Sequence, residues 1–424
     1  MPRMFISGMS GNEIYCLRLK GIEPAEITVG NSVRSLGVAG GLSSLGRSLA
    51  GGEIAPITQM ISEGRHAAIQ RMEDEARKHG ATGVTGVVSE LRTLAGYTEF
   101  LAQGTSVNDT RGQLPFFSSA ASGIELYCHL DAGYRPMKFV MGNIAYALGV
   151  GRGLMGSVRT LARGEVREFS SMYNQIRHTA LDRLKAEAAQ AGANAVVDVN
   201  VQMLPHGPGT VELLLTGTAS HHDGFSSGPV SPSQVVTSEL SGEELWNLTQ
   251  LGLVPHQLVM ATSVCSLGVV GGFAAMFQGL ARGELNDVTR LVYEARENCL
   301  SLIREEARQI GAERVIGNKL QIREIGSGLI EIVAVGTAVR RGDERFRTDT
   351  AQLIPQAVIV ERGSQGGGQT VQGLAPAVAP MQLAQGGARV AGNQAIGCVI
   401  AIVAMGFVFL FTFVVALLEA LGRH

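Results

Sequence analysis

A long stretch near the start of the chain has apolar residues at helical spacing. Between residues 53 and 79 they lie three, four or seven apart, at Ile57, Met60, Ile61, Ala68, Met72 and Ala76. This is the period of one helical face, and it predicts a helix that packs on a sheet. Pro56 suits the first turn of such a helix, and Gly80 suits its C-cap.

The same pattern occurs three times in the chain. The third occurrence has the stripe at Val288, Leu291, Val292, Cys299, Ile303 and Ala307. Before each long helix, a Ser cap opens a shorter predicted helix, as in SGEELWNLTQLG, and an extended segment such as HQLVM follows it. After each long helix come two apolar runs around a turn, such as RVIGNKLQI and LIEIVAVGTAV, which predict a β-hairpin.

The repeats are in register over most of their length. SGNEIY, SGIELY and SGEELW open them, each lies 26 residues before an LGV, and QGTSV, TGTAS and VGTAV close them. The sequence therefore predicts an α+β protein built of three tandem repeats, each a small sheet packed on one long helix. Repeat 1 spans 10–107, repeat 2 spans 122–220 and repeat 3 spans 241–339. The linkers at 108–121 and 221–240 are rich in Ser, Gly and Pro, as flexible joints are.

The glycine-rich run LGVAGGLSSLG at 36–46 raises the possibility of a phosphate-binding loop. Its glycines have the wrong spacing for one, and no lysine follows. Related glycine-rich runs stand at the same place in the other two repeats, before each long helix. We therefore interpret the run as the connection from strand to helix, where glycine allows close packing or unusual dihedral angles.

The motif set resembles the YbjQ family. The residues that carry the resemblance in repeat 1 are Leu36–Val38, Gly51–Glu53, Gly80–Ala81 and Glu99 with Gly104–Thr105. Equivalent sets occur in repeats 2 and 3. The resemblance implies small α+β units that assemble into closed rings, usually described as pentamers, and it carries a heavy-metal-binding label. The three tandem repeats, the segment before each of them and the apolar C-terminal stretch are departures from that family pattern.

Four charged positions are identical in all three repeats. They are Glu53, Glu165 and Glu284; Arg65, Arg177 and Arg296; Glu75, Glu187 and Glu306; and Glu99, Glu212 and Glu331. Arg65 falls at the edge of the apolar stripe, where an unpaired charge would be costly. We expect a strand glutamate such as Glu99, or Glu53 of a neighbouring subunit, to pair with it and fix helix to sheet or subunit to subunit. The alternative is a ring of carboxylates that lines a pore or a metal site.

The chain shows no catalytic motif, and we expect no enzyme, no cofactor and no metal site. None of the nucleophile or zinc-protease motifs is present, and the five cysteines have no metal-ligand spacing. We interpret His221, His222 and Asp223 as solvated linker residues. A net charge of −2 gives no reason to expect nucleic acid as a partner.

The C-terminal part differs in composition from the repeats. We expect residues 340–395 to form a flexible tether, because residues 363–395 are low in charge and rich in Gly, Gln, Ala and Pro, although AQLIPQAVIV at 351–360 would suit a further strand. Residues 396–418 are 23 residues without a charge, which is long enough for a transmembrane helix. We expect a single-pass membrane protein with the bulk of the chain in the cytoplasm.

These observations favour a membrane-tethered scaffold that assembles with itself into rings or a cage. A metal-binding or metal-sensing oligomer is the alternative, and an enzyme with its site between subunits is a third class. Two ring geometries are open. Each repeat could pair with its own kind, which gives stacked rings and is the geometry that a five-membered ring favours. Otherwise the repeats pair in sequence, and the ring holds a multiple of three units.

Overall fold

The computed structural model describes residues 6–35, 52–94, 97–147, 164–206, 210–225, 228, 230–266, 286–326 and 329–346. The chain divides into two compact units, Met1–Thr370 and Val371–His424, and every described residue belongs to the first. The predicted transmembrane helix at 396–418, the tether beyond residue 346, the glycine-rich run at 36–46 and Glu284 lie outside the described residues. No helix within the described ranges is long and apolar enough to cross a membrane.

Each repeat opens with a short helix, as the Ser caps predicted. These helices are α1 (Gly11–Leu19), α4 (Gly123–Asp131) and α7 (Gly242–Gln250). In each, the Ser hydroxyl accepts a hydrogen bond from the backbone of a Glu three residues on, and that Glu side chain accepts one from the Ser backbone. This reciprocal capping satisfies two N–H groups at the helix start.

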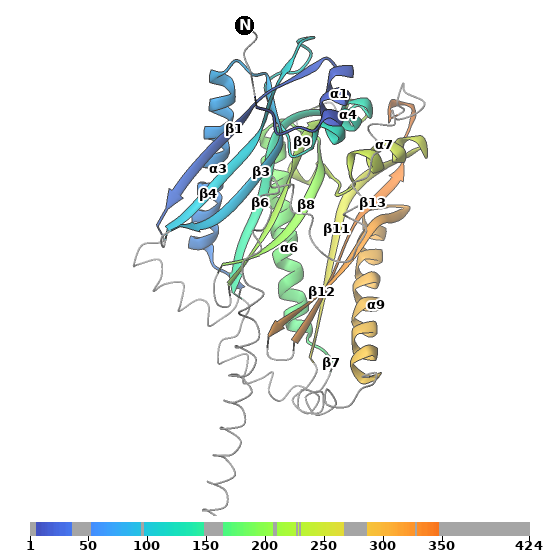
Figure 1. Ribbon diagram of the computed structural model, residues 1–424. Helices are drawn as coiled ribbons and strands as arrows, with labels where there is room; N and C mark the ends of the chain where they lie inside the picture. The colour runs from blue at the N-terminus through green and yellow to red at the C-terminus, as the bar shows by residue number, and fades with distance from the viewer. Residues whose placement is uncertain are drawn as a thin grey trace, which may run out of the picture. The chain divides into compact units, whose positions relative to one another are not determined.

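The predicted long helices are confirmed. They are α3 (Ala55–Lys78), α6 (Arg167–Gln190) and α9 (Asn286–Gln309), each of 24 residues. Pro56 lies in the first turn of α3, and Gly80 has φ +77° just beyond its end, as a left-handed helix terminus requires. Figure 1 shows each of the three helices running along a sheet.

Three long antiparallel strands in each repeat include the predicted hairpin. They are β1 (Ile22–Arg34), β3 (Gly83–Leu94) and β4 (Tyr97–Asp109); β6 (Arg135–Ala147), β8 (Ala195–Pro205) and β9 (Thr210–His221); and β11 (Leu253–Ser266), β12 (Arg314–Gly326) and β13 (Leu329–Arg341). The second hairpin strand lies in the middle, so that the order in repeat 1 is β1-β4-β3. Repeats 2 and 3 keep the same order.

Two very short strands join the repeats. β2 (Gly52–Glu53) belongs to repeat 1 but pairs with β6 of repeat 2, and β7 (Gly164–Glu165) belongs to repeat 2 but pairs with β11 of repeat 3. Each of the first two repeats therefore extends the sheet of the next one. Within the chain the repeats therefore pair in sequence, which is the pairing that the second ring geometry uses.

The described parts of both linkers are structured, which corrects the prediction of flexible joints. β5 (Phe117–Ser118) pairs in parallel with β3, and β10 (Val236–Thr237), preceded by the 3-10 turn η1 (Pro232–Gln234), pairs in parallel with β8. Phe117, Val235 and Val236 in these segments are buried, and this burial holds the Ser- and Pro-rich linkers in place. A further 3-10 turn, η2 (Glu344–Phe346), follows repeat 3.

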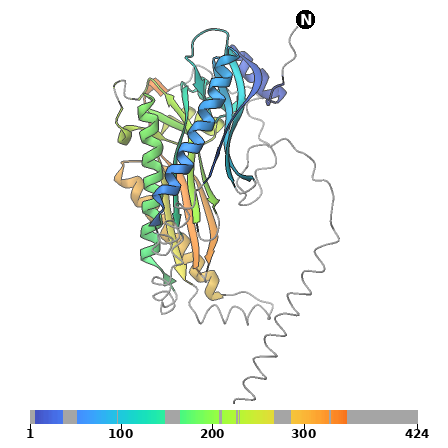
Figure 2. The same cartoon turned by 90° about the vertical axis from the view of Figure 1, so that its left-hand side faces the viewer.

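The hydrophobic core continues from one repeat into the next. Ile61, Ala68 and Met72 of α3 pack against Phe100 of their own sheet and also against Phe139 of repeat 2. The cluster around α6 likewise holds residues of β11, β12 and β13 in repeat 3. The cluster around α9 contains residues of repeat 3 alone. Thus α3 and α6 are each covered by two sheets, whereas among the described residues α9 is covered by one. Figure 2 shows α3 and α6 against the strands from the side.

Candidate assembly interface

A buried ion pair fixes repeat 1 to repeat 2. The Arg65 guanidinium donates from Nη2 to Glu212 Oε2 over 2.9 Å and from Nε to Oε1 over 3.3 Å. Both side chains are fully buried. Arg65 Nη1 also donates to the carbonyl and hydroxyl oxygens of Ser89 in its own sheet. The arginine thus bridges two sheets, and its partner is the repeat-2 counterpart of Glu99 rather than Glu99 itself or Glu53.

The same pair recurs between repeats 2 and 3. Arg177 Nη2 donates to Glu331 Oε1 over 2.7 Å, and both side chains are buried. Glu331 also accepts from Arg323, whose Nη2 donates to the Tyr146 hydroxyl over 3.0 Å. Burial alone would raise the pKa of Glu331, but the two arginines hold it below its usual value. The carboxylate therefore stays charged inside the junction.

Asparagine and histidine complete the first junction, and the sequence analysis missed both. Asn143 Nδ2 donates to Glu212 Oε1 over 3.3 Å, and His206 Nε2 lies 2.9 Å from Oε2. Burial would raise the pKa of Glu212, and Arg65 and His206 lower it overall. His206 occurs in one repeat alone, so no repeated position marked it. Asn143 could have been found, because Asn31 occupies its place in repeat 1.

The Gly-Glu signature before the first two long helices forms the short strands β2 and β7. Glu53 accepts two hydrogen bonds from Arg183 Nη2 of repeat 2, over 2.9 and 3.1 Å. Glu165 accepts from Asn298 Nδ2 of repeat 3 over 2.8 Å. In both cases a carboxylate of one repeat is bound by the long helix of the next.

The carboxylate near the end of each long helix bonds to a strand of its own repeat. Glu75 accepts from the Val29 backbone over 2.6 Å, and Glu187 accepts from the Met141 backbone over 3.1 Å. Glu306 accepts from the Met260 backbone. This position fixes helix to strand within a repeat. At the first junction it has a second role, because His66 Nε2 of repeat 1 lies 3.2 Å from Glu187.

At the two ends of the array, the arginine of repeat 3 and the glutamate of repeat 1 that correspond to the buried pairs are not covered by another repeat among the described residues. Arg296 lies at an exposed position of α9 and has no ion pair within the described ranges. Glu99 is half-buried, and it accepts a hydrogen bond from Asn31 Nδ2 over 3.4 Å, as Glu212 accepts from Asn143. Glu99 therefore accepts the same asparagine hydrogen bond as Glu212, but no arginine of the described residues pairs with it.

The apolar residues at the two ends of the array are likewise more exposed than their counterparts at the internal junctions. Ile27, Val29 and Val33 on β1 are 42%, 44% and 52% exposed. Their counterparts are buried by the helix of the preceding repeat, at Phe139, Met141 and Ala145 in repeat 2 and at Leu258, Met260 and Val264 in repeat 3. Within the described ranges β1 is also the edge strand of its sheet, whereas β6 and β11 carry β2 and β7 on that edge. On α9, Tyr293 is 60% exposed.

The donors in the described residues do not fit a transition metal. No group of three or more His, Cys, Asp or Glu side chains comes together there. The two oxygens of Glu212 beside His206 already accept from Arg65, whose positive charge opposes a cation. Burial raises the pKa of the Cys265 thiol to about 11 and that of Cys299 to about 12, so both stay protonated, and a thiolate is the form that binds metal.

The interpretation of His222 as a solvated linker residue is wrong. Its ring is buried and stacks on Phe346 at 4.7 Å between centroids. The Gly224 backbone donates to Nδ1, and Nε2 lies 3.1 Å from the Ala132 carbonyl. Burial lowers the pKa of His222. His221 and Asp223 bind Arg135 instead. These contacts fix residues 221–223 against the rest of the protein at the end of repeat 2.

Together, the fold and the junctions define a class: a tandem-repeat protein in which each repeat is locked onto the next by a donated strand, a shared helix and a buried Arg-Glu pair. The chain belongs to the YbjQ family, whose sequence model, described as "Putative heavy-metal-binding", matches residues 19–110, 133–222 and 253–341.

Three relatives differ in how much of this chain they match. An encapsulin nanocompartment protein of Mycobacterium tuberculosis is 32% identical over 247 residues, 55% of this chain and 92% of its own length. UPF0145 proteins match a fifth of this chain. The one from Methanoregula boonei is 41% identical over 85 residues, 71% of its length, and the one from Thermosipho africanus is 41% identical over 87 residues, 81% of its length.

Proposed function

We propose that this protein is a non-enzymatic scaffold whose copies join head to tail, so that α9 of one chain packs on the outer face of β1 and β4 in the next. The observation that carries the proposal is that Arg296 and the β1 stripe are exposed and Glu99 is only half-buried, whereas their counterparts are buried at both internal junctions. A repeat array is usually closed by terminal repeats with polar outer faces. In the described part of the chain, the first repeat instead ends on an edge strand with exposed apolar residues, which is a site for association with another chain.

A second copy of the chain is the occupant that fits both ends. A surface that is complementary to a different surface of the same molecule makes a heterologous contact, and such contacts form a closed ring where the rotation allows it. We propose a ring in which the number of repeats is a multiple of three. The relative named as an encapsulin nanocompartment protein supports an assembled product.

Charge reversal tests the contact, in protein truncated after Gln394 to remove the apolar stretch. Glu99→Arg or Arg296→Glu alone should raise the dissociation constant about 100-fold, since like charges across an interface cost several kcal/mol. The chain with both changes should assemble again. Glu168→Arg, at an exposed position of the middle repeat, is the matched control. Mass photometry measures the outcome, and a wild-type monomer at micromolar concentration with native circular dichroism would overturn the proposal.

We further propose that residues 396–418 anchor the assembly in a membrane and leave the repeats on the cytoplasmic side. The uncharged length of the stretch supports this. Truncation after Gln394 should move the protein to the soluble fraction and leave assembly intact. Sedimentation of the truncated protein with membranes after a high-salt wash would show that another part of the chain binds them.

A further inference from the structure

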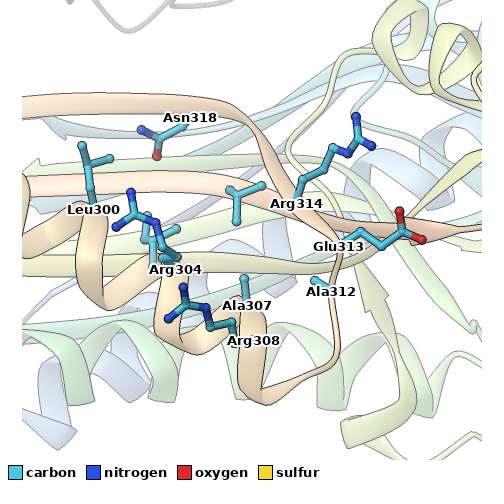
Figure 3. Close-up of a pocket in the computed structure, with 10 residues that line it drawn as sticks. Leu300, Arg304, Ala307, Arg308, Ala312, Glu313, Arg314 and Asn318 are labelled. Carbon is cyan, nitrogen blue, oxygen red and sulfur yellow. The ribbon is translucent and has the colours of Figure 1, made fainter.

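Among the residues that the structure describes, repeat 3 has a groove at a place where repeats 1 and 2 are filled. It has a volume of about 450 Å³ between α9 and the start of β12, with Ile303 and Ala307 on the helix side and Ala312 and Val315 on the strand side. Figure 3 shows α9 and the β12 segment flanking it, with Arg304 and Arg308 projecting from the helix. Within the described part of the chain, β12 is the edge strand of its sheet.

In repeat 1, the linker fills the corresponding place. Phe116 packs against the cluster around α3, and Arg77, the counterpart of Arg308, lies over its ring at 3.7 Å. β5 binds the edge of β3 by three backbone hydrogen bonds. They run from Phe117 to the Thr82 carbonyl, from Ser119 to the Val84 carbonyl and from Val87 back to the Ser119 carbonyl.

Repeat 2 is filled in the same way. Val235 is buried in the cluster around α6. The backbone N–H of Val236 donates to the Asn194 carbonyl, that of Ser238 donates to the Val196 carbonyl, and that of Val199 donates back to the Ser238 carbonyl. The occupant is thus the same in both repeats: a short extended segment from the linker that follows the repeat.

The chain after repeat 3 carries a matching sequence. The repeat-2 occupant reads Pro-Ser-Gln-Val-Val-Thr-Ser from Pro232, and residues 355–361 read Pro-Gln-Ala-Val-Ile-Val-Glu. In this alignment Val358 takes the place of Val235, and Ile359 takes that of Val236. The matching segment begins at Pro355, 14 residues after the end of β13. In repeat 2, the corresponding strand β10 follows the end of β9 at a comparable distance along the chain, so the segment can reach its own repeat.

We propose that residues 355–361 bind in this groove as a short parallel strand beside β12 of their own chain, with the Val358 side chain between Ile303 and Val315. The segment would bring its backbone groups to the open edge of β12 and cover Val315, which is half-buried where Val84 and Val196 are fully buried. Strand addition to a sheet edge combines backbone hydrogen bonds with a pocket for alternate side chains.

Hydrogen exchange tests this docking in the full-length protein. By the register of repeats 1 and 2, the amide of Asn318 donates to the carbonyl of Glu361. Val358→Asp should speed the exchange of peptides that cover 314–320 at least tenfold and leave α3 and α6 unchanged. Ala357→Asp is the control, because it adds the same charge at the position of Gln234, which is exposed. Equal exchange in wild type and Val358→Asp would overturn the proposal.

A synthetic peptide separates the possible occupants. In protein truncated after residue 354, the peptide of residues 355–361 should restore slow exchange at 314–320, and a scrambled peptide should not. Failure of the specific peptide would count against the groove as its site. Slow exchange that disappears on dilution of the full-length protein would assign the groove to a second chain instead. Neither result depends on the head-to-tail assembly.

Discussion

The internal junctions and the ends of the repeat array carry corresponding side chains in different surroundings. Arg65 and Glu212 are removed from water, and Arg177 and Glu331 nearly so, whereas Arg296 is exposed and Glu99 half-buried. The stripe on β1 is exposed where its counterparts on β6 and β11 are buried. The difference lies in the neighbour rather than in the residues, because a following or preceding repeat covers each internal position in the described structure.

The largest expected effect comes from breaking an internal pair. Arg65→Ala should lower the free energy of unfolding by about 3–5 kcal/mol, because it leaves the Glu212 carboxylate buried without its main partner. Arg296→Ala should change the free energy of unfolding of dilute protein by less than about 0.5 kcal/mol, as surface substitutions do. Urea denaturation of both variants measures the contrast. Equal losses would mean that Arg296 is already buried against a partner in the dilute chain.

The apolar stripes give a second matched pair. Met141→Asp places a charge between α3 and β6 and should unfold the first junction. Val29→Asp places the same charge at the corresponding exposed position, so it should leave the thermal midpoint of dilute protein within a few degrees of wild type. It should still weaken the association of chains about 100-fold, because a buried unpaired charge is costly. Sedimentation velocity across a concentration series would detect the change, and unaltered association would remove β1 from the interface.

A single substitution should strengthen the contact between chains. The internal junctions place His66 near Glu187, and His178 occupies the same position of the next helix, but repeat 3 has Glu297 there. In a head-to-tail contact Glu297 faces Glu75, and two carboxylates repel. Glu297→His should therefore lower the dissociation constant about tenfold near pH 6, which corresponds to about 1.4 kcal/mol. Glu294→His, on the same helix, should not have this effect.

The smallest effect concerns pH at the first junction. The hydrogen bond to Glu187 raises the pKa of His66 above 6.5, so its contribution is complete below pH 6.5 and is lost as pH rises through the raised value. Burial would raise the pKa of Glu187, yet His66 holds it below 4.5, and that contribution is lost only in acid. The difference in unfolding free energy between wild type and His66→Ala should be below about 1 kcal/mol and should shrink as pH rises through the raised pKa of His66. A difference that grows with pH would contradict this.

The repetition made the local structure predictable. The stripe of α3, the Ser caps and the hairpins follow from periodicity, and three copies showed them three times. Repetition also left the partner of each arginine ambiguous. Arg65 and Glu99 recur together in every repeat, so identity alone could not tell whether the arginine reaches its own strand or the next one. A two-residue strand such as Gly52–Glu53 has no alternating pattern, so its transfer to the next sheet was beyond prediction.

The linkers were misinterpreted for a different reason. Their Ser, Gly and Pro content suggests flexible joints, but Phe116 and Phe117 in one and Val235 and Val236 in the other are adjacent apolar pairs. Such a pair can serve the two faces of a short strand. That signal was available in the sequence, and the same pair at Val358 and Ile359 carries the inference about the groove.

Cross-linking between positions 99 and 296 tests the head-to-tail contact most directly. Cys16, Cys128, Cys265 and Cys299 are buried, and truncation after Gln394 removes Cys398, so a thiol introduced at either position is the one accessible to a short bis-maleimide. Glu99→Cys protein mixed with Arg296→Cys protein should give covalent dimers that contain one chain of each kind. Each variant alone should give none. Cross-linked dimers from one variant alone, or none from a mixture that still assembles, would contradict the account.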